Sequence, residues 1–553
     1  MSGRVLFLML IGSLLIFSSC SNDTENIERQ PGMTKAGDMR NISIDELRDK
    51  IAGGWAGKMI GVSYGAKSEF RALGKTYEEP LPWEPSMLEN SIMQDDIYVQ
   101  MSFMMTMDKY GINASAKQFG ESFASAGYRL WHANVMARKN YFDGIYPPDS
   151  GSPEYNLHAD DIDFQIEADY IGFMCPGMPV TANKLADKVG RVMNYGDGLY
   201  GGMFVAALYA EAFFNDDIPA IVERALLSIP AESDYYKCIR DVVILHAHYP
   251  DDWRAAWAEL ENKWGDVDIC GALVPFNIDA KLNGAYIIMG LLYGDGDFEK
   301  TMEVSTRCGQ DSDCNPSNAA AVIGVINGLS GIPDEWKSGL DAIADSTFIF
   351  TNYTFNTAVD RTMHYAREFI TRNDGQWPDK QKEGEANGIA IKYQEPLAPP
   401  LEVAFPDMVP DYRSNAFEDD GWSFTGDWKI ETRNDKPFSK YSANAGDEVS
   451  FTFNGSGVVI RGDWRKNSGK ADAYIDGKFH RSFDTHFFWA DQEKFDAFLW
   501  HITGLNSGKH TVKIVVKGQK KDNSEGANIY IKGATVFKTG KKKNETVKFS
   551  FEK

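Results

Sequence analysis

The sequence has few cysteines, and their spacing is not that of a disulfide-rich or zinc-binding domain. Six occur in 553 residues, and no two of them form a Cys-x-x-Cys pair. This excludes a dense disulfide framework and argues against a structural zinc site. We expect most of the five internal cysteines to be small buried hydrophobic residues; they are Cys175, Cys238, Cys270, Cys308 and Cys314.

Positive charge is also scarce. The chain has 57 lysines and arginines against 79 aspartates and glutamates, which gives a formal net charge of −22. A field of this sign repels phosphate backbones, so we expect no nucleic-acid partner. A surplus of carboxylates suits the binding of hard cations, although solvation accounts for most of the acidity.

Long apolar runs are missing apart from one near the N-terminus. Arg4 precedes an apolar run at 5–17, which is too short to cross a bilayer of about 30 Å as a helix. Ser18-Ser19-Cys20 follows, and the pattern indicates a secretory signal peptide at 1–19. Phe17-Ser18-Ser19-Cys20 resembles a bacterial lipobox, which predicts a lipid on Cys20 and a tether at 20–40. Ordinary signal cleavage is the alternative.

The polar stretch at 21–26 resembles the surface-export signal of Bacteroidetes lipoproteins. We therefore expect an exported protein that is lipid-anchored to the outer membrane, on its periplasmic side or at the cell surface. Lipid would be its only membrane anchor. No feature of the sequence indicates an oligomeric state.

Hydrophobic periodicity divides the remaining chain into two regions. Apolar residues recur at three and four as far as about residue 368, which predicts helices, and short alternating runs after Pro396 predict strands. We expect an all-α domain at 41–394, a Pro-rich linker at 395–415, an antiparallel β-sandwich at 416–540 and a basic tail at 541–553. The expected helices are 43–50, 97–107, 116–126, 162–174, 202–214, 218–227, 234–248, 251–264 and 319–329, and the expected strands are 448–453, 457–461, 471–475, 510–516 and 528–532.

Two short acidic motifs precede predicted helices. Gln94-Asp95-Asp96 opens the first, where carboxylates complement the helix dipole, so helix capping explains this pair when it is taken alone. In Asp311-Ser312-Asp313-Cys314, two carboxylates alternate on a Gly-led turn before an Ala-rich helix. Such carboxylates can face one cation, and oxygen ligands suit magnesium, calcium or manganese. An Asx-turn is the alternative.

A third acidic cluster, at 156–167, also opens a predicted helix. Capping explains most of its acids, but Asp161 or Asp163 could bind sugar hydroxyls. Upstream, Trp131, His132 and Asn134 offer an aromatic platform and hydrogen bonds for a sugar ring. Packing at a helix end is the alternative for these three residues.

Glycine is unusually dense in two segments. The helical pattern at 53–65 carries five glycines, and Glu69 follows it. Each glycine costs about 1 kcal/mol relative to alanine inside a helix, which suggests close backbone packing beneath a site. The run at 194–202 contains Gly196-Asp197-Gly198, which fits either a ligand cradle or tight helix packing.

Taken together, these segments resemble the ADP-ribosylglycohydrolase family of the dinitrogenase-reductase-activating glycohydrolase type. The features that match are a Gly-rich segment ending in glutamate, an Asp-Asp helix start and Gly-x-Asp-x-Asp before an Ala-rich helix, over roughly residues 45–345. The resemblance implies an all-α fold with two magnesium ions between helices. It also implies cleavage of a bond to the anomeric carbon of ribose. By position, the implied metal ligands are Asp95, Asp96, Asp311 and Asp313, with Glu69 as a catalytic or metal-associated glutamate and the 194–202 run as part of the substrate site.

The sequence departs from the family pattern at four positions. Gln94, Ile97 and Cys314 stand where the family usually has threonine, and Val62 stands where it commonly has aspartate. A thiol is a soft ligand that suits magnesium poorly. We keep Gln94 and Cys314 in the predicted ligand set, and we expect one or two Mg²⁺ ions, with Mn²⁺ or Ca²⁺ as alternatives.

The expected function is metal-dependent hydrolysis of an N- or O-ribosyl or furanosyl bond, with Glu69 and Asp96 as catalytic residues. Export favours an extracellular glycan or ribosyl compound as substrate. The alternative is a catalytically inactive, glycan-binding surface lipoprotein. The β region resembles a galactose-binding-like jelly roll. Some of its aromatic residues could stack on sugars, while several are expected to fill the core: Trp422, Trp428, Trp464, Phe487, Phe488, Trp489 and Trp500.

Overall fold

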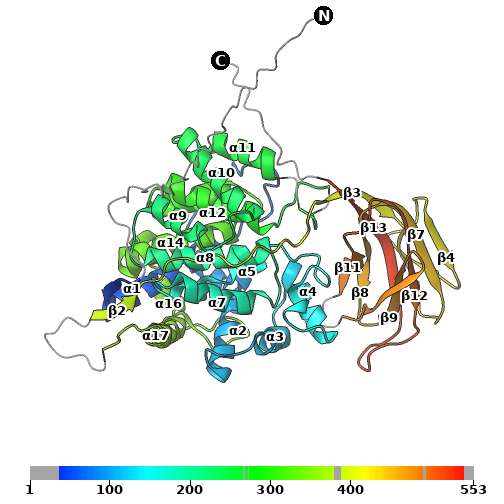
Figure 1. Ribbon diagram of the computed structural model, residues 1–553, viewed down its shortest axis with the longest axis horizontal. Coiled ribbons are helices and arrows are strands. Elements are labelled where there is room, and N and C mark those ends of the chain that lie inside the picture. Colours follow the sequence, from blue (N-terminus) through cyan, green and yellow to red (C-terminus); the bar gives the residue numbers. More distant parts are fainter. Residues whose placement is uncertain are drawn as a thin grey trace, which may run out of the picture. The chain divides into compact units, whose positions relative to one another are not determined.

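The computed structural model describes residues 37–265, 268–271, 273–378, 388–487, 489 and 493–540. The predicted signal peptide, Cys20, most of the tether, the basic tail and Phe488 lie outside these residues. Within them the chain forms a helical region and then a β region, as the colours in Figure 1 show. The predicted order of an all-α and then an all-β domain is confirmed. None of the helices in this part of the chain is both long enough and apolar enough to cross a membrane.

The helical region runs from α1 to α17. Ser43 caps α1, within the helix predicted at 43–50, by accepting a hydrogen bond from the N–H of Glu46 at 3.0 Å. The helices are α1 (Ile44–Gly65), η1 (Pro85–Met93), α2 (Asp95–Tyr110), α3 (Ala116–Ser125), α4 (His132–Phe142), η2 (Asp149–Gly151), α5 (Asp163–Ile166), α6 (Asp169–Phe173), α7 (Pro179–Gly190), α8 (Asp197–Ala212), α9 (Ile218–Leu226), α10 (Asp234–His248), α11 (Trp253–Trp264), α12 (Ala280–Gly294), α13 (Phe298–Arg307), α14 (Cys314–Gly331), α15 (Asp334–Lys337), α16 (Leu340–Ile343) and α17 (Phe355–Arg372), of which η1 and η2 are 3-10 helices.

The Gly-rich segment makes α1 pack directly on α14. A Cβ atom at Gly57 would lie 2.3 Å from the carbonyl oxygen of Ala320, and one at Gly61 would lie 2.4 Å from that of Pro316. Any side chain at these positions would collide with the backbone of α14, so glycine permits the close approach. The predicted backbone packing is confirmed. It brings the C-terminal end of α1 to the N-terminal end of α14.

The single helix predicted at 162–174 is wrong, because two short helices, α5 and α6, occupy this segment. The break between them follows from hydrogen bonds to the carbonyl oxygen of Ile166. This oxygen accepts from Nζ of Lys58 at 2.9 Å and from Nε2 of Gln100 at 3.3 Å. These polar groups come from distant parts of the chain, and apolar periodicity cannot predict them.

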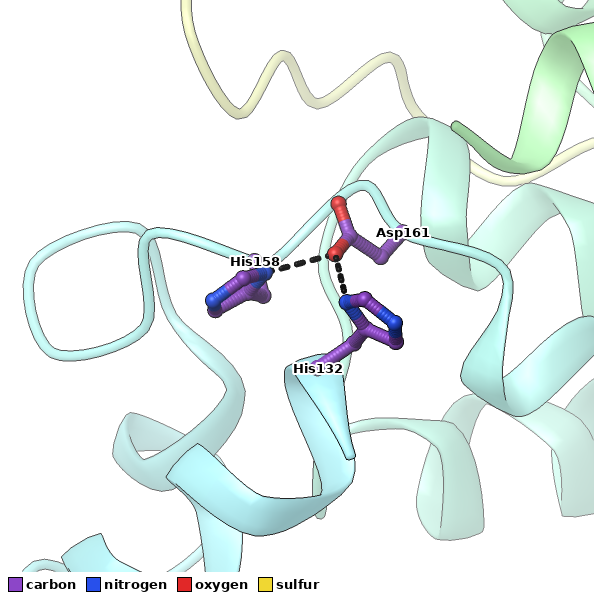
Figure 2. A group of neighbouring side chains, drawn as sticks. All are labelled: His132, His158 and Asp161. Carbon is purple, nitrogen blue, oxygen red and sulfur yellow. Dashed lines mark hydrogen bonds and ion pairs between the residues drawn. The ribbon is translucent and has the colours of Figure 1, made fainter. Parts of the chain in front are cut away.

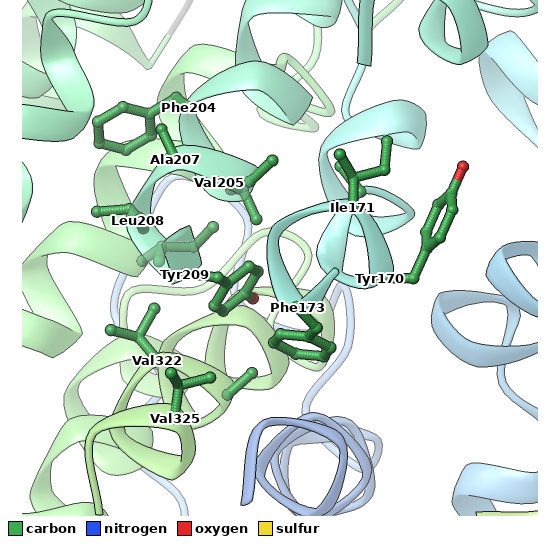
Figure 3. Close-up of a cluster of buried hydrophobic side chains, with 14 of the residues drawn as sticks. Tyr170, Ile171, Phe173, Phe204, Val205, Ala207, Leu208, Tyr209, Val322 and Val325 are labelled. Carbon is green, nitrogen blue, oxygen red and sulfur yellow. The ribbon is translucent and has the colours of Figure 1, made fainter. Parts of the chain in front are cut away.

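The core of the helical region lies where α6, α8 and α14 meet, and Figure 3 shows its apolar side chains. The ring of Phe173 in α6 is 4.7 Å from that of Tyr209 in α8 and 5.1 Å from that of Trp55 in α1. The hydroxyl of Tyr209 donates to Asp169. The hydrophobic core therefore continues directly into a buried polar group.

A small antiparallel sheet, which the sequence analysis did not predict, pairs β1 (Met39–Ser43) with β2 (Gly388–Lys392). The remaining strands form two antiparallel sheets, ordered β10-β9-β12-β7-β4 and β11-β8-β13-β6-β5, with β3 paired to β13. Their bounds are β3 (Met408–Asn415), β4 (Trp422–Thr425), β5 (Lys429–Arg433), β6 (Lys436–Ser442), β7 (Glu448–Gly455), β8 (Gly457–Trp464), β9 (Lys470–Ile475), β10 (Lys478–Asp484), β11 (Lys494–Ile502), β12 (Gly508–Val516) and β13 (Ile529–Thr539). Strand β3 falls within the segment predicted as linker.

The two sheets share one hydrophobic core. Phe451 of β7 and Ile460 of β8 belong to the same buried cluster, although their strands lie in different sheets. Alternating residues of β7, β9 and β12 belong to this cluster, which explains the alternation seen in these strands. Trp464, Phe487 and Trp500 are buried, as expected for core aromatic residues.

Candidate active site

The close packing of α1 on α14 assembles a group of three carboxylates. One carboxylate oxygen each of Glu69, Asp311 and Asp313 lies within 4.8 Å of the other two. The segments that carry them are tied together, because Oγ of Ser68 is 2.9 Å from Oγ of Ser312. The structure thus brings Glu69 and Asp311 together, although they lie 242 residues apart in the sequence (311 − 69).

Asp311 and Asp313 are both buried, with 4% and 3% of their surface exposed. Burial and the charge of Asp311 raise the pKa of Asp313, and the two carboxyl groups hydrogen-bond to each other when one of them is protonated, which raises that pKa further. When both are ionised, that bond is lost and Oδ1 of each lacks a donor among the described residues. A buried carboxylate oxygen without a donor is unfavourable, and a bound cation removes that cost. Burial raises the pKa of Asp311 to about 8, with Glu69 and Asp96 adding to the shift. The arrangement therefore fits a cation site.

Glu69 is the exposed member of this group. Burial of its carboxyl, together with the nearby carboxylates of Asp313 and Asp96, raises the pKa of Glu69 to about 8. A carboxyl group with a pKa near neutral can both give and accept a proton at pH 7. Its position at the solvent side of two buried acids suits proton transfer to a substrate.

Asp96 forms a buried ion pair with Lys58, a residue for which the sequence analysis gave no role. Nζ of Lys58 lies 2.9 Å from Oδ1 of Asp96 and 3.1 Å from Oδ2 of Asp169. Burial acts to lower the pKa of Lys58, but the carboxylates of Asp169 and Asp96 outweigh it and raise that pKa. The sequence signal that could have indicated this ion pair is a lysine placed within an apolar, Gly-rich helix.

Cys314 is the hydrogen-bond donor to the other oxygen of Asp96. Its Sγ lies 3.1 Å from Oδ2 of Asp96. Burial raises the pKa of the Cys314 thiol, and the carboxylates of Asp311 and Asp313 raise it further. The thiol is therefore protonated at neutral pH, and together with Lys58 it holds both oxygens of Asp96 in place.

Asp95 opens α2 beside the same acids. Burial raises its pKa well above the usual value, and Asp96, Asp313 and Glu69 add to the shift. The carbonyl oxygen of Gln94 accepts from the N–H groups of the first turn, and its side chain does not cap the helix. The structure thus gathers five of the predicted acids in one place, and we call them the acidic group: Glu69, Asp95, Asp96, Asp311 and Asp313.

The buried acids of the third motif are divided between a helix cap and a contact with two histidines. Asp163 accepts from the N–H groups of Ala133 at 3.1 Å and Asn134 at 3.0 Å, so it caps α4 from a distant segment. The side chain of Asn134 donates to Glu167. Burial is the largest effect on Asp163 and raises its pKa to about 7, although the backbone bonds from Ala133 and Asn134 act to lower it.

Asp161 lies with two histidines outside the acidic group (Figure 2). Its Oδ2 is 2.6 Å from Nδ1 of His158 and 3.7 Å from Nδ1 of His132. Burial lowers the pKa of His132 to about 4 and that of His158 well below its usual value, so both rings are neutral at pH 7. The ring of Phe276 stacks on His132 and also contacts Phe70, the neighbour of Glu69.

The other predicted substrate residues belong to the framework or the surface. A Cβ atom at Gly196 would lie 3.0 Å from the backbone nitrogen of Ala404, and one at Gly198 would lie 2.5 Å from the carbonyl oxygen of Ala159, so packing accounts for both glycines. The carboxylate of Asp197 accepts from the N–H of Tyr235 at 3.2 Å. Trp131 is exposed, with Nζ of Lys494 5.9 Å from its ring centre.

The chain is similar to proteins of known structure over parts of its length. An ADP-ribosylglycohydrolase-related protein complex matches 59% of this chain and 99% of its own, at 16% identity and a TM-score of 0.41. A two-domain esterase (CEX) active on acetylated mannans matches 37% and 51%, at 12% identity and a TM-score of 0.21. The CBM36-1 domain of a multidomain xylanase from the hindgut metagenome of Trinervitermes trinervoides matches 22% and 94%, at 17% identity and a TM-score of 0.17.

A search of curated proteins gives no match to the chain. The family model described as ADP-ribosylglycohydrolase matches residues 43–369, which is more than half of the chain and contains every member of the acidic group. The chain therefore belongs to the ADP-ribosylglycohydrolase family.

Proposed function

We propose that the protein hydrolyses an N- or O-ribosyl or furanosyl bond in a cation-dependent reaction. Family membership indicates a glycohydrolase-type function. The observation that supports cation dependence is the pair of buried acids beside the titratable Glu69, Asp311 and Asp313, whose Oδ1 atoms lack donors when both are ionised. Neutral hydrogen-bonding residues would suffice if this pair only shaped the fold.

The donor atoms favour a hard divalent cation. Asp311 and Asp313 would hold it through oxygen, with Asp95 adjacent, and such ligands suit Mg²⁺, Mn²⁺ or Ca²⁺. The ion would orient sugar hydroxyls and stabilise charge in the transition state. We propose one ion rather than two, because the ammonium of Lys58 already supplies the positive charge beside Asp96.

The chain's own residues would divide the remaining work. Glu69, the exposed carboxyl beside the two buried acids, can donate a proton to the leaving group while it is protonated. Once deprotonated, it can accept a proton from the attacking water. Asp96 is fixed by Lys58 and Cys314 and acts as a positioning residue, so we assign the proton transfer to Glu69.

The substrate class follows from the expected location. The signal peptide and the lipid on Cys20 remain predictions, and they favour an extracellular glycan or ribosyl compound over an intracellular ADP-ribosylated protein. The β region would then help to hold a glycan. Trp428 is partly exposed and is a candidate for a sugar contact in that region. Trp489 instead stacks on Phe142 of α4 and donates its N–H to the carbonyl oxygen of Ala126.

The experiment is a substrate screen with the full-length protein purified in detergent. Nitrophenyl furanosides, nucleosides and ADP-ribosylated peptides are incubated with Mg²⁺, Mn²⁺ or Ca²⁺ and with a chelator. We expect release of product from at least one class with a metal, none with the chelator, and at least 100-fold slower release for Asp313→Asn. Glycan binding without any hydrolysis would instead support the inactive surface lipoprotein.

A further inference from the structure

Two histidines and one aspartate converge on a single point away from the acidic group. Nδ1 of His158 lies 2.6 Å and Nδ1 of His132 lies 3.7 Å from the same oxygen, Oδ2 of Asp161 (Figure 2). The three ligand atoms all lie within 4.8 Å of one another. The residues come from the start of α4 and from the loop before α5.

A hydrogen bond alone does not explain this arrangement. The hydrogen bond between Nδ1 of His158 and Oδ2 of Asp161 involves only one imidazole. His132 also points its Nδ1 at Oδ2 of Asp161, but at 3.7 Å it is too far away for a hydrogen bond. Around a tetrahedral zinc ion with bonds of about 2.0–2.1 Å, ligand atoms lie about 3.3 Å apart. The observed separations of 2.6 Å and 3.7 Å bracket that value, so small ring movements would admit an ion.

The two imidazoles are held with their edges toward Asp161. The ring of Phe276 stacks on His132 at 5.7 Å and 23°, and that of Phe498 stacks on His158 at 5.1 Å and 16°. His132 also has a φ of 39°, a left-handed value that is unfavourable for a residue with a side chain. Such strain persists where the surroundings fix a functional geometry.

The two imidazoles are partly exposed and the carboxylate between them is buried. The side chain of Asp161 is 2% exposed, whereas those of His158 and His132 are 16% and 26% exposed. An ion that enters past the rings would exchange solvent for these three ligand atoms. Aromatic contacts link this site to the acidic group, because the ring of Phe276 contacts both His132 and Phe70, the neighbour of Glu69.

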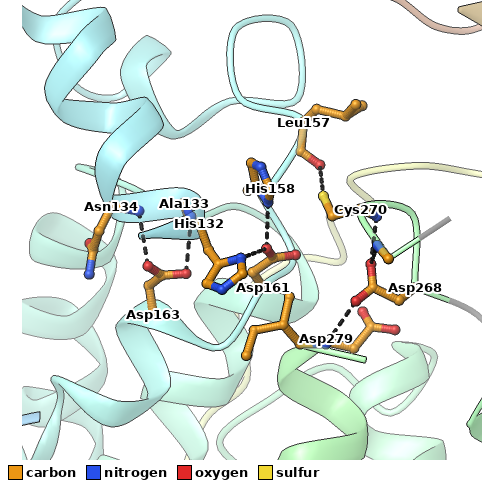
Figure 4. A network of polar contacts seen from close by, with 12 residues as sticks. His132, Ala133, Asn134, Leu157, His158, Asp161, Asp163, Asp268, Cys270 and Asp279 are labelled. Carbon is orange, nitrogen blue, oxygen red and sulfur yellow. Dashed lines mark hydrogen bonds and ion pairs between the residues drawn. The ribbon is translucent and has the colours of Figure 1, made fainter. Parts of the chain in front are cut away.

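A thiol lies next to the same carboxylate (Figure 4). One ligand atom each of Asp161, Asp268 and Cys270 lies within 4.8 Å of the others. The oxygens of Asp268 are engaged by the backbone N–H groups of Cys270, Gly271 and Ile278, so this aspartate shapes the loop. The thiol of Cys270 donates to the carbonyl oxygen of Leu157 at 3.1 Å, so it is not part of the proposed ligand set.

From these contacts we propose that His132, His158 and Asp161 form a second cation site that binds a divalent transition-metal ion, with Zn²⁺ as the best fit. Two imidazole nitrogens with one carboxylate suit Zn²⁺ better than Mg²⁺ or Ca²⁺. The oxygen ligands of Asp311 and Asp313 instead favour Mg²⁺ or Ca²⁺ over Zn²⁺. This site goes beyond the proposed hydrolysis and stands independently of it.

The test is zinc binding by the full-length protein after removal of metals with a chelator. Titration with Zn²⁺ is followed by calorimetry and by metal analysis after desalting. We expect one zinc per chain, and at least a 100-fold weaker affinity in the variant His132→Gln/His158→Gln. The control His364→Gln changes a histidine of α17 whose side chain is 47% exposed, and it should bind zinc like the wild type. Asp311→Asn should also keep the zinc, which separates this site from the acidic group.

Wild-type crystals soaked in zinc and measured at the zinc absorption edge provide a readout that needs no variant to fold. An anomalous peak bonded to both imidazoles is expected. The proposal is overturned by a peak only at the acidic group, by no peak, or by unchanged zinc affinity in the double-histidine variant.

Discussion

Lys58 and Asp96 form an ion pair from which solvent is excluded: their atoms Nζ and Oδ1 are 2.9 Å apart, and neither side chain has any exposed surface. Lys58 lies on α1 and Asp96 on α2, so the pair joins the Gly-rich helix to the acidic motif. The second oxygen of Asp96 accepts from Cys314 of α14. Three helices thus fix one carboxylate at the edge of the candidate active site.

The first prediction concerns this pair. Lys58→Met leaves Asp96 and Asp169 buried without their positive partner, and removing one member of a buried pair costs about 3–5 kcal/mol. Urea unfolding should show that loss of stability. Lys67→Met, at an exposed position shortly after the same helix, is the control and should be neutral. A loss below about 1 kcal/mol for Lys58→Met would show that the pair does not stabilise the fold.

Gly61→Ala tests the contact between α1 and α14. The added methyl group would lie 2.4 Å from the carbonyl oxygen of Pro316, so the helices must separate. We expect a lower melting temperature together with weaker activity, because the same contact aligns Glu69 with Asp311. Gly508→Ala places its methyl group in open space and should melt within about 2 °C of the wild type, since surface substitutions usually stay within about 0.5 kcal/mol. Equal melting temperatures for the two variants would refute the packing argument.

Glu69→Gln keeps the size of the side chain and removes its proton-transfer group. A general acid or base contributes roughly 10²–10⁴-fold, so turnover should fall by that factor while the thermal response to metal remains. Glu84→Gln, at an exposed position before η1, is the matched control. Turnover of Glu69→Gln at the wild-type rate would remove Glu69 from the mechanism.

His501 gives a pH prediction. Burial, aided by the nearby Arg481, lowers the pKa of His501 to about 3 in the folded chain, although a backbone contact with Pro153 opposes the shift. The unfolded chain, with the usual histidine pKa of about 6.5, binds the proton more readily, so stability falls as the pH drops from about 6.5 toward 3. Melting curves of His501→Asn should fall less over this range than those of the wild type. A parallel decline in both proteins would contradict the assignment, and His364→Gln serves as the exposed control.

Much of the site could be predicted from the sequence because its signals are local. Glycines at every fourth position from Gly53 to Gly65 predict close backbone packing, and the structure shows it against α14. The two aspartate motifs sit at helix starts, which the sequence marks clearly. The family resemblance rested on the order of these features: the Gly-rich segment, then Glu69, then the two aspartate motifs. The family model confirms it.

What the sequence could not show depends on contacts between distant segments. Nothing local reveals that Lys58 meets Asp96 and Asp169, because an isolated lysine in a helix is ordinarily solvated. The same contact interrupts the helix predicted at 162–174. His158 was not singled out, since its partner His132 lies 26 residues earlier (158 − 132) and neither stands in a ligand motif.

The central claim is that Asp311 and Asp313 hold a divalent cation in the active site, and one measurement tests it most directly. Melting temperatures of the wild type and of Asp311→Asn are recorded in chelator and in millimolar Mg²⁺ or Mn²⁺. Binding at a concentration of 100 times Kd stabilises by about 2.7 kcal/mol, so the wild type should melt several degrees higher with metal. The variant should lose this response. A wild type that melts at the same temperature with and without metal, or an equal rise in both proteins, would contradict the account.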